Sequence, residues 1–236
     1  MNRSRPVKCI AFLPITLVLA ASGHVSPMGR AEEKADFSRW EKDIAAFERR
    51  DRDKPPPKNA VLFVGSSSIR LWDLPKSFAG MEVINRGFGG SQLADVVHFA
   101  PRIVLPYDPR VIVLYAGDND IAAGKSPERV HDDFQAFERT VHKKWPKIRI
   151  VYIAIKPSIL RWQLIDKIRK ANALIEAECK KSDGLVYLDI VAPMLGKDGK
   201  PRPELFRDDG LHLNEKGYAL WTELLKPHLE PKRSQK

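Results

Sequence analysis

The sequence predicts an α/β fold in which helices cover both faces of a doubly wound, five-stranded parallel sheet. Two observations lead to this prediction. Five short runs rich in Val and Ile alternate along the chain with stretches of helical pattern, and this alternation builds right-handed βαβ units. The runs are almost continuously apolar, as are strands buried on both faces. The chain has 236 residues, of which 43% are hydrophobic, so one such domain needs no disulfide or metal to hold its core.

The first element of the chain is an apolar segment, Cys9–Ala21, which follows the basic residues Arg3, Arg5 and Lys8. Small residues come after it, and the whole pattern over residues 1–31 is typical of a secretory signal peptide. We therefore expect the protein to be exported, to the periplasm or the extracellular space. The apolar segment is shorter than the ~20 residues that span a bilayer, and an uncleaved N-terminal anchor is the alternative.

The charge balance first suggests a nucleic-acid partner, because 40 Lys and Arg against 30 Asp and Glu give a net charge of +10. Four of the basic residues lie in the predicted signal peptide, which has no acidic residue, so its removal leaves 36 against 30, a charge of +6. More basic residues lie in a tail at residues 231–236, and no basic run is interleaved with aromatic residues. We therefore predict no nucleic-acid partner and, after signal cleavage, no stable membrane association. The oligomeric state stays open.

Residues 32–58 form the next segment, which is highly charged and ends in a run of prolines. Four apolar residues in it recur with helical spacing and predict an amphipathic helix on the domain surface: Phe37, Trp40, Ile44 and Phe47. The prolines then end the helix. The domain itself is expected over residues 59–230. Its single cysteine, Cys179, lies in a helical pattern and is expected to be buried and structural.

The strands of the domain are predicted from its apolar runs, at Ala60–Val64, Glu82–Asn85, Val111–Tyr115, Arg149–Ile155 and Leu185–Asp189. The helices between and after them are predicted from helical patterns, at Leu93–Ile103, Pro127–Lys144, Arg161–Lys180 and Glu215–His228. In such sheets, ligands bind beyond the carboxyl ends of the strands. The residues that follow each strand are therefore the ones expected to carry the function.

The first of these loops holds three serines in a row, Ser66, Ser67 and Ser68. A serine on a tight turn between strand and helix presents its hydroxyl at the sheet edge, beside free N–H groups that can hold a developing anion. Taken alone, such serines are more often a helix N-cap in a polar turn. They do not form a Gly-x-Ser-x-Gly elbow, because Ile69 stands where the second glycine belongs.

Other loops hold the partners that acyl transfer by a serine requires. Asp209 and His212 are three residues apart, a spacing that lets the carboxylate orient the imidazole as a general base. Gly90 can offer a backbone N–H, and Asn119 a side-chain amide, to an oxyanion, although each alone is more often a turn residue. A metal site is not predicted, because no further His or Cys lies at a suitable spacing.

The four elements follow one another in the order Ser, Gly, Asn and Asp–His, and here the sequence resembles the SGNH (GDSL-like) hydrolase family over nearly all of residues 59–228. The resemblance implies a three-layer α/β/α, flavodoxin-like fold with no cofactor. It also implies that Ser67 is the nucleophile, that His212 and Asp209 complete a triad, and that Ser67, Gly90 and Asn119 form the oxyanion hole. One position departs from the family pattern, because Ser66 stands where an Asp usually precedes the nucleophile.

The expected activity is that of a serine esterase. The predicted export of the protein and the resemblance to carbohydrate esterases of the family favour the removal of O-acetyl groups from a carbohydrate. Arg161 and Trp162 follow the fourth strand and are the expected substrate contacts, although packing at the start of a helix explains them equally well. The segment Leu195–Arg207 is expected to form the other wall of the site. A lysophospholipase or broad-specificity arylesterase is the alternative enzyme, and a non-catalytic glycan-binding module is the alternative outside catalysis.

Overall fold

A computed structural model of the protein describes Met1 and residues 36–229. Apart from Met1, the predicted signal peptide, residues 1–31, lies outside the described residues, as does the basic tail, residues 231–236. Within them, no helix is long and apolar enough to cross a membrane.

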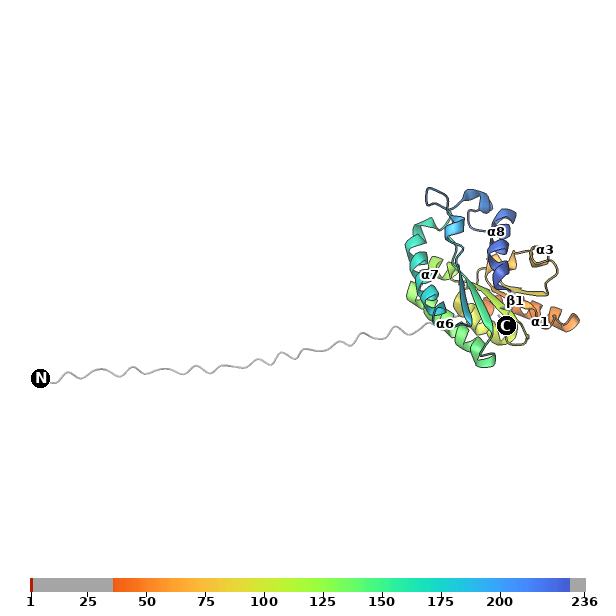
Figure 1. The fold of residues 1–236 in the computed structure, drawn as a ribbon. Coiled ribbons are helices and arrows are strands. Elements are labelled where there is room, and N and C mark those ends of the chain that lie inside the picture. The colour runs from red at the N-terminus through yellow and green to blue at the C-terminus, as the bar shows by residue number, and fades with distance from the viewer. Residues whose placement is uncertain (2–35, 230–236) are drawn as a thin grey trace, which may run out of the picture. The chain divides into compact units, whose positions relative to one another are not determined.

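The centre of the domain is a sheet of five parallel strands in the order β2-β1-β3-β4-β5. This is the flavodoxin-like order, and it confirms the predicted doubly wound sheet (Figure 1). The strands are β1 Val61–Gly65, β2 Val83–Gly87, β3 Val111–Tyr115, β4 Arg149–Ile153 and β5 Leu185–Leu188. Their ends differ from the predicted ones by at most two residues. The largest extension is in β2, where Arg86 and Gly87 pair with Val64 and Gly65.

Helices cover both faces of the sheet, so the fold has three layers (Figure 1). Alternate residues of each strand contribute side chains to two separate hydrophobic cores. Leu62 and Val64 pack on one face of the sheet, and Val61 and Phe63 pack on the other. The first face is covered by α1 (Glu41–Asp53), α4 (Leu93–Ile103), α6 (Pro127–Lys144) and α7 (Ile165–Cys179). The second is covered by α2 (Ser67–Arg70), α3 (Leu74–Ser77) and α8 (Glu215–Leu225).

The helix predictions hold where the hydrophobic pattern is long. The bounds of α4 and α6 are the predicted ones. The predicted helix Arg161–Lys180 is a 3-10 turn, η2 (Trp162–Leu164), followed by α7, and the predicted Glu215–His228 is α8 followed by η5 (Lys226–His228). The further 3-10 turns are η1 (Ser38–Trp40), η3 (Ala192–Met194) and η4 (Pro203–Leu205). Three short helices were not predicted, because one turn is too short to show a period: α2, α3 and α5 (Asp118–Ala122).

The N-terminal helix α1 is fixed to the domain by apolar and ionic contacts. Ile44 and Phe47 are buried in the core. Asp51 pairs with Arg86, whose side chain is 8% exposed, and also accepts a hydrogen bond of 2.5 Å from Tyr107 Oη. Arg86 Nε donates to the same tyrosine oxygen at 2.6 Å. An ion pair as largely buried as this one is costly to break, so these contacts fix α1 to the sheet.

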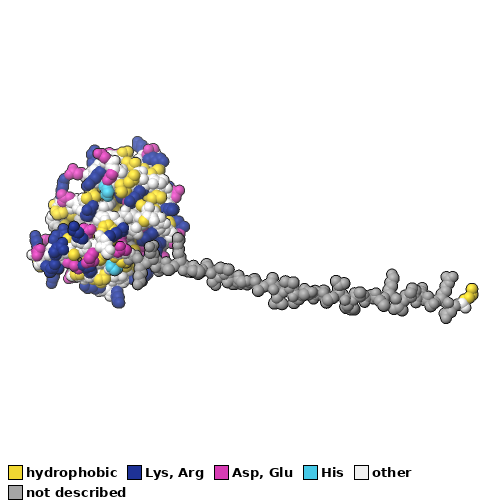
Figure 2. Space-filling model, turned by 180° about the vertical axis from the view of Figure 1, so that it is seen from behind, with side chains coloured by type: hydrophobic (Ala, Val, Ile, Leu, Met, Phe, Trp, Pro, Cys, Tyr) yellow, Lys and Arg dark blue, Asp and Glu magenta, His cyan; other side chains and the backbone are white. Residues whose placement is uncertain are grey.

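The surface carries both charge signs. On the face drawn in Figure 2, Lys and Arg side chains are interspersed with Asp and Glu. The cysteine of the domain, Cys179, is 6% exposed at the end of α7. Burial raises the pKa of its thiol to about 12, so the thiol is a poor nucleophile there.

Candidate active site

Ser67 is held at the carboxyl end of β1 by a turn that only glycine permits. Gly65, the last residue of the strand, has φ +140°, and a Cβ there would lie 1.9 Å from the carbonyl oxygen of Tyr115. The next residue, Ser66, is 2% exposed and donates its N–H to the same carbonyl at 3.0 Å. Ser67 then opens α2 with a half-buried side chain at the edge of the sheet.

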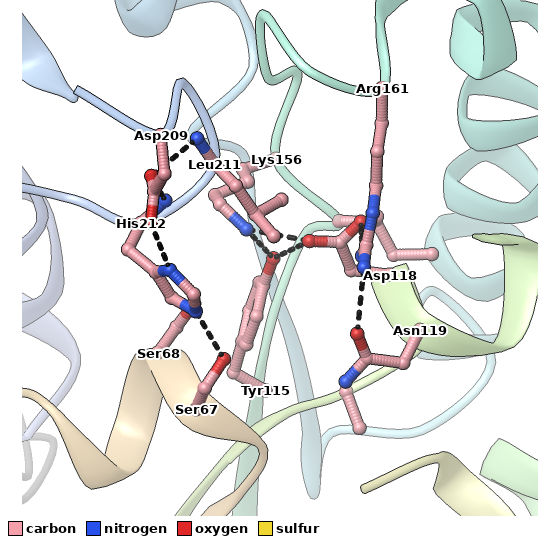
Figure 3. A network of polar contacts seen from close by, with 12 residues as sticks. Ser67, Ser68, Tyr115, Asp118, Asn119, Lys156, Arg161, Asp209, Leu211 and His212 are labelled. Carbon is pink, nitrogen blue, oxygen red and sulfur yellow. Dashed lines mark hydrogen bonds and ion pairs between the residues drawn. The ribbon is translucent and has the colours of Figure 1, made fainter. Parts of the chain in front are cut away.

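A continuous line of hydrogen bonds joins Ser67 to His212 and Asp209 (Figure 3). His212 Nε2 lies 3.1 Å from Ser67 Oγ, and His212 Nδ1 lies 2.6 Å from Asp209 Oδ2. A carboxylate can only accept hydrogen bonds, so the Nδ1 proton points at Asp209 and the Nε2 lone pair faces the serine. The imidazole is therefore in the tautomer that a general base toward Ser67 requires.

The carboxylate of Asp209 is itself fixed by the turn that carries it. Its Oδ1 accepts the backbone N–H groups of Leu211, at 2.9 Å, and His212, at 2.8 Å. Desolvation alone would raise the pKa of Asp209, but the hydrogen bonds from the His212 ring and from these two N–H groups outweigh it and lower the pKa to about 2. Asp209 thus stays ionised while its side chain is 45% exposed.

The two predicted oxyanion donors, Gly90 and Asn119, are brought together by Ser91. Asn119 Nδ2 donates to the carbonyl oxygen of Ser91 at 3.0 Å, and Ser91 directly follows Gly90. Gly90 is exposed and has φ +78°. The loop that carries it is joined to the turn that carries Ser67, because Phe88 donates its N–H to the carbonyl of Gly65 at 2.9 Å.

Asn119 reaches this position because α5 begins directly at the end of β3. The N-cap of α5, Gly117, has φ +114°, so the chain turns abruptly there. Asp120, which is fully buried, fixes the other side of the turn: its carboxylate accepts the N–H of Leu93 at 3.1 Å and pairs with Lys125 at 2.9 Å. Helices α4 and α5 therefore start from a common anchor beside Asn119.

The two predicted substrate contacts have different surroundings. The guanidinium of Arg161 faces inward, where Nη1 lies 2.6 Å from Asp118 Oδ1 and Nη2 donates to Asn119 Oδ1 at 3.1 Å. Trp162 is half-buried, and the ammonium of Lys200 lies 4.9 Å from its ring centre. Lys200 belongs to the segment Leu195–Arg207, which therefore does approach Trp162. Substrate binding by Arg161 and Trp162 stays a prediction.

Comparison with known proteins supplies the family. The sequence model of the GDSL-like Lipase/Acylhydrolase family matches residues 70–220. The chain belongs to this family. The matched range includes Gly90, Asn119, Asp209 and His212, and it begins three residues after Ser67. No protein with curated annotation matches the chain in sequence.

Solved structures of the same fold agree with this assignment. A Streptococcus pneumonia protein described as a candidate platelet activating factor is 20% identical, with a TM-score of 0.73 over 82% of this chain and 94% of its own. A GDSL-like lipase from Bacteroides thetaiotaomicron is 22% identical, with a TM-score of 0.67 over 84% and 98%. A family 3 carbohydrate esterase from Talaromyces cellulolyticus is 19% identical, with a TM-score of 0.57 over 72% and 95%.

This GDSL-like hydrolase has a second polar cluster at its site, which the sequence did not reveal (Figure 3). Lys156 is 1% exposed, and its Nζ lies 2.6 Å from Asp118 Oδ2 and 3.1 Å from Tyr115 Oη. Burial would raise the pKa of Asp118, but the charges of Lys156 and Arg161 outweigh it and lower that pKa. Burial, with the Asp118 charge, raises the pKa of Tyr115 well above its usual range. The one available signal was a lysine directly after an apolar strand.

Within the described residues, no cluster of His, Cys, Asp or Glu has the arrangement of a metal site. The groups assembled at the carboxyl edge of the sheet are a hydroxyl with an adjacent base, amide donors and buried cations. Such groups suit nucleophilic attack on a carbonyl and stabilisation of the negative charge that develops on its oxygen.

Proposed function

We propose that this GDSL-family hydrolase is a serine esterase that cleaves carboxylic esters with Ser67, His212 and Asp209 as its triad. The observation that carries the proposal is the unbroken line of hydrogen bonds from Asp209 through His212 to Ser67. A serine at a strand end is common, but a serine facing the free Nε2 of a histidine that a carboxylate orients is the arrangement of an activated nucleophile.

The reaction follows from this arrangement in two halves. His212 Nε2 takes the proton of Ser67 as Oγ attacks the ester carbonyl, and the backbone N–H groups of Ser67 and Gly90 and the amide of Asn119 hold the oxyanion. His212 then protonates the leaving alcohol, and an acyl group remains on Ser67. Water, deprotonated by His212, attacks this acyl-enzyme and releases the acid, which restores the serine. Asp209 remains a carboxylate throughout and stabilises the imidazolium.

We further propose O-acetyl groups on a carbohydrate as the substrate class, with Trp162 beside the alcohol part. Support comes from the half-buried aromatic ring of Trp162 after β4 and from fold neighbours that are carbohydrate esterases. The N-terminal pattern of residues 1–31 supports export of the enzyme to a compartment where such glycans occur.

One observation favours a second candidate, a lysophospholipase or arylesterase. Ile159 and Leu160 are 44% and 56% exposed. They lie beside the triad, because Leu160 donates its N–H to the carbonyl of Gly210 at 3.0 Å, between Asp209 and His212. An apolar pair at this place suits the alkyl or aryl part of a lipophilic ester.

The test of the catalytic proposal compares Ser67→Ala with Ser68→Ala. We expect the first to lower kcat on p-nitrophenyl acetate by roughly 10⁴-fold or more, because no other group replaces the nucleophile. Ser68 is the matched control: it is 1% exposed and its side chain forms a hydrogen bond with Tyr115, so its hydroxyl is not at the reacting atoms. Retained activity in Ser67→Ala would overturn the assignment of the nucleophile.

The substrate class is tested by release of acid from acetylated xylan, pectin and sialoglycan, with a lysophospholipid in the same series. Acetate release from a glycan at a higher kcat/KM than from the lysophospholipid supports the carbohydrate proposal. The opposite order supports the second candidate. Wild-type protein that binds glycans but hydrolyses no ester would contradict both and indicate a binding module.

A further inference from the structure

The side-chain amide of Asn119 can act as an oxyanion donor in only one of its two orientations. In the structure, its Nδ2 faces the carbonyl of Ser91 at 3.0 Å and its Oδ1 accepts from Arg161 Nη2 at 3.1 Å. Turning the amide over would place two oxygens against each other at Ser91, and two sets of N–H groups against each other at Arg161. Arg161, which has no acceptor atom, and the carbonyl of Ser91 therefore together fix the orientation that leaves the second Nδ2 proton for a substrate.

Arg161 is itself held by a buried chain of charges. Its Nη1 lies 2.6 Å from Asp118 Oδ1, and the other oxygen of Asp118 lies 2.6 Å from Lys156 Nζ. The side chains of Asp118 and Lys156 are 5% and 2% exposed, and that of Arg161 is 17% exposed. Charges this deeply buried stay in place only when they are paired. The guanidinium is consequently a rigid support for Asn119 (Figure 3).

The cluster also has an excess of positive charge on the side of Asn119. Two cations, Lys156 and Arg161, share one carboxylate, Asp118. A hydrogen bond from a cation to the amide oxygen polarises the amide and strengthens its N–H groups as donors. An oxyanion bound to the Asn119 amide would meet this polarised donor in a site where dipoles are already oriented.

We propose that Arg161 is a positioning residue for the oxyanion donor Asn119, and that Asp118 and Lys156 hold Arg161 in place. This proposal rests on the proposed esterase function, and it gives Arg161 a role other than direct contact with substrate. The support acts on the transition state, in which the oxyanion forms, and much less on the ground-state ester. Loss of Arg161 should therefore lower kcat and leave KM nearly unchanged.

The experiment is a double-mutant cycle with Arg161→Gln, Asn119→Ala and the double variant, assayed for kcat and KM on p-nitrophenyl acetate. We expect Asn119→Ala to lower kcat about 100-fold and Arg161→Gln to lower it about 10-fold, with KM within a factor of two. In the Asn119→Ala background, Arg161→Gln should cause no further loss, because the group it positions is gone.

The matched control is Arg149→Gln. Arg149 lies at the amino end of β4, on the edge of the sheet opposite the site, and donates to the carbonyl of His228 at 3.1 Å. The Arg149→Gln substitution should leave kcat unchanged. Arg161→Lys covers the case in which Arg161→Gln does not fold: it keeps the charge beside Asp118 but has no second nitrogen for Asn119, so its kcat should also fall.

Three results would overturn the proposal. Equal losses of kcat from Arg161→Gln in the wild-type and Asn119→Ala backgrounds would show that Arg161 does not act through Asn119. A raised KM with unchanged kcat would make Arg161 a substrate contact. Wild-type kcat in Asn119→Ala, with Ser67→Ala inactive, would remove Asn119 as a donor while the esterase function stands. Activity in Ser67→Ala would instead show that the proposed function itself has failed.

Discussion

Two arginines of this hydrolase, Arg86 and Arg161, make similar contacts. Arg86 pairs with Asp51, which also accepts from a tyrosine hydroxyl, and Arg161 pairs with Asp118, which lies 3.5 Å from the hydroxyl of Tyr115. Both guanidinium groups are largely buried, with side chains 8% and 17% exposed. The sequence predicts a substrate contact for Arg161 and assigns no role to Arg86.

The difference lies in the groups to which each arginine donates besides its carboxylate. Besides Tyr107, Arg86 donates to a backbone carbonyl, that of Asn85, at 2.8 Å. Arg161 donates instead to a side-chain amide, that of Asn119, which has two possible orientations. A backbone carbonyl is already fixed by the strand, so Arg86 can add only stability. A side-chain amide is not, so Arg161 can determine which of its ends faces a substrate.

The largest expected effect on stability comes from removing the carboxylate that pairs with each arginine. Asp51→Ala and Asp118→Ala each leave a buried arginine without its partner, and breaking such a pair costs roughly 3 kcal/mol or more of the free energy of unfolding. We expect both variants to lose stability in urea denaturation, with Asp118→Ala alone losing kcat as well. A loss of kcat in Asp51→Ala, measured on folded protein, would mean that the two arginines do not differ as described.

A second prediction asks whether the α1 side of the molecule also reaches the site. Trp40, just before α1, packs edge-on against Phe88 with ring centres 5.5 Å apart, and a Cβ at Gly90 would lie 3.3 Å from its indole ring. Truncation of a buried aromatic residue costs ~3–5 kcal/mol, and because Trp40 is half-buried we expect about 2 kcal/mol for Trp40→Ala.

The kcat of Trp40→Ala should fall by less than that of Asn119→Ala, because the Gly90 loop loses packing while the Asn119 donor stays. Trp40→Phe is the control that keeps an aromatic ring against the loop. A normal kcat in Trp40→Ala, at the expected loss of stability, would confine the contribution of the N-terminal segment to folding. Thermal unfolding and steady-state kinetics on the same samples separate the two effects.

The contacts of these two arginines also show which parts of the structure can be predicted from the sequence. The strands, the long helices and the pairing of Asp209 with His212 were predictable, because each depends on a local pattern: an apolar run, a helical period, or Asp209 three residues before His212. Ser67 was singled out among three serines by the resemblance to the family, and its role stays a proposal. The ion clusters were not, because their partners are far apart in the chain. Asp118 and Lys156 are separated by 38 residues and Asn119 and Arg161 by 42, so only the order of the strands brings them together.

The smallest predicted effect is the contribution of the Asp209 charge to the free energy of unfolding. The Asp209 side chain is 45% exposed, whereas that of Asp118 is 5% exposed. The hydrogen bonds that lower the Asp209 pKa from 3.8 to about 2 favour the folded state above about pH 4. This stabilisation is lost as the pH falls through about 2. Solvent screening at such an exposed group keeps the effect below about 1 kcal/mol.

The measurement is the free energy of unfolding of the wild type and of Asp209→Asn, determined by urea denaturation between pH 7 and pH 2. The Asn side chain keeps an oxygen for the N–H groups of Leu211 and His212 but carries no charge. The wild type should be the more stable protein at pH 7, and the gap should close as the pH approaches 2. A gap that stays constant over this range would show that the Asp209 charge contributes nothing to stability, and that the hydrogen bonds of its turn are equally strong with a neutral acceptor.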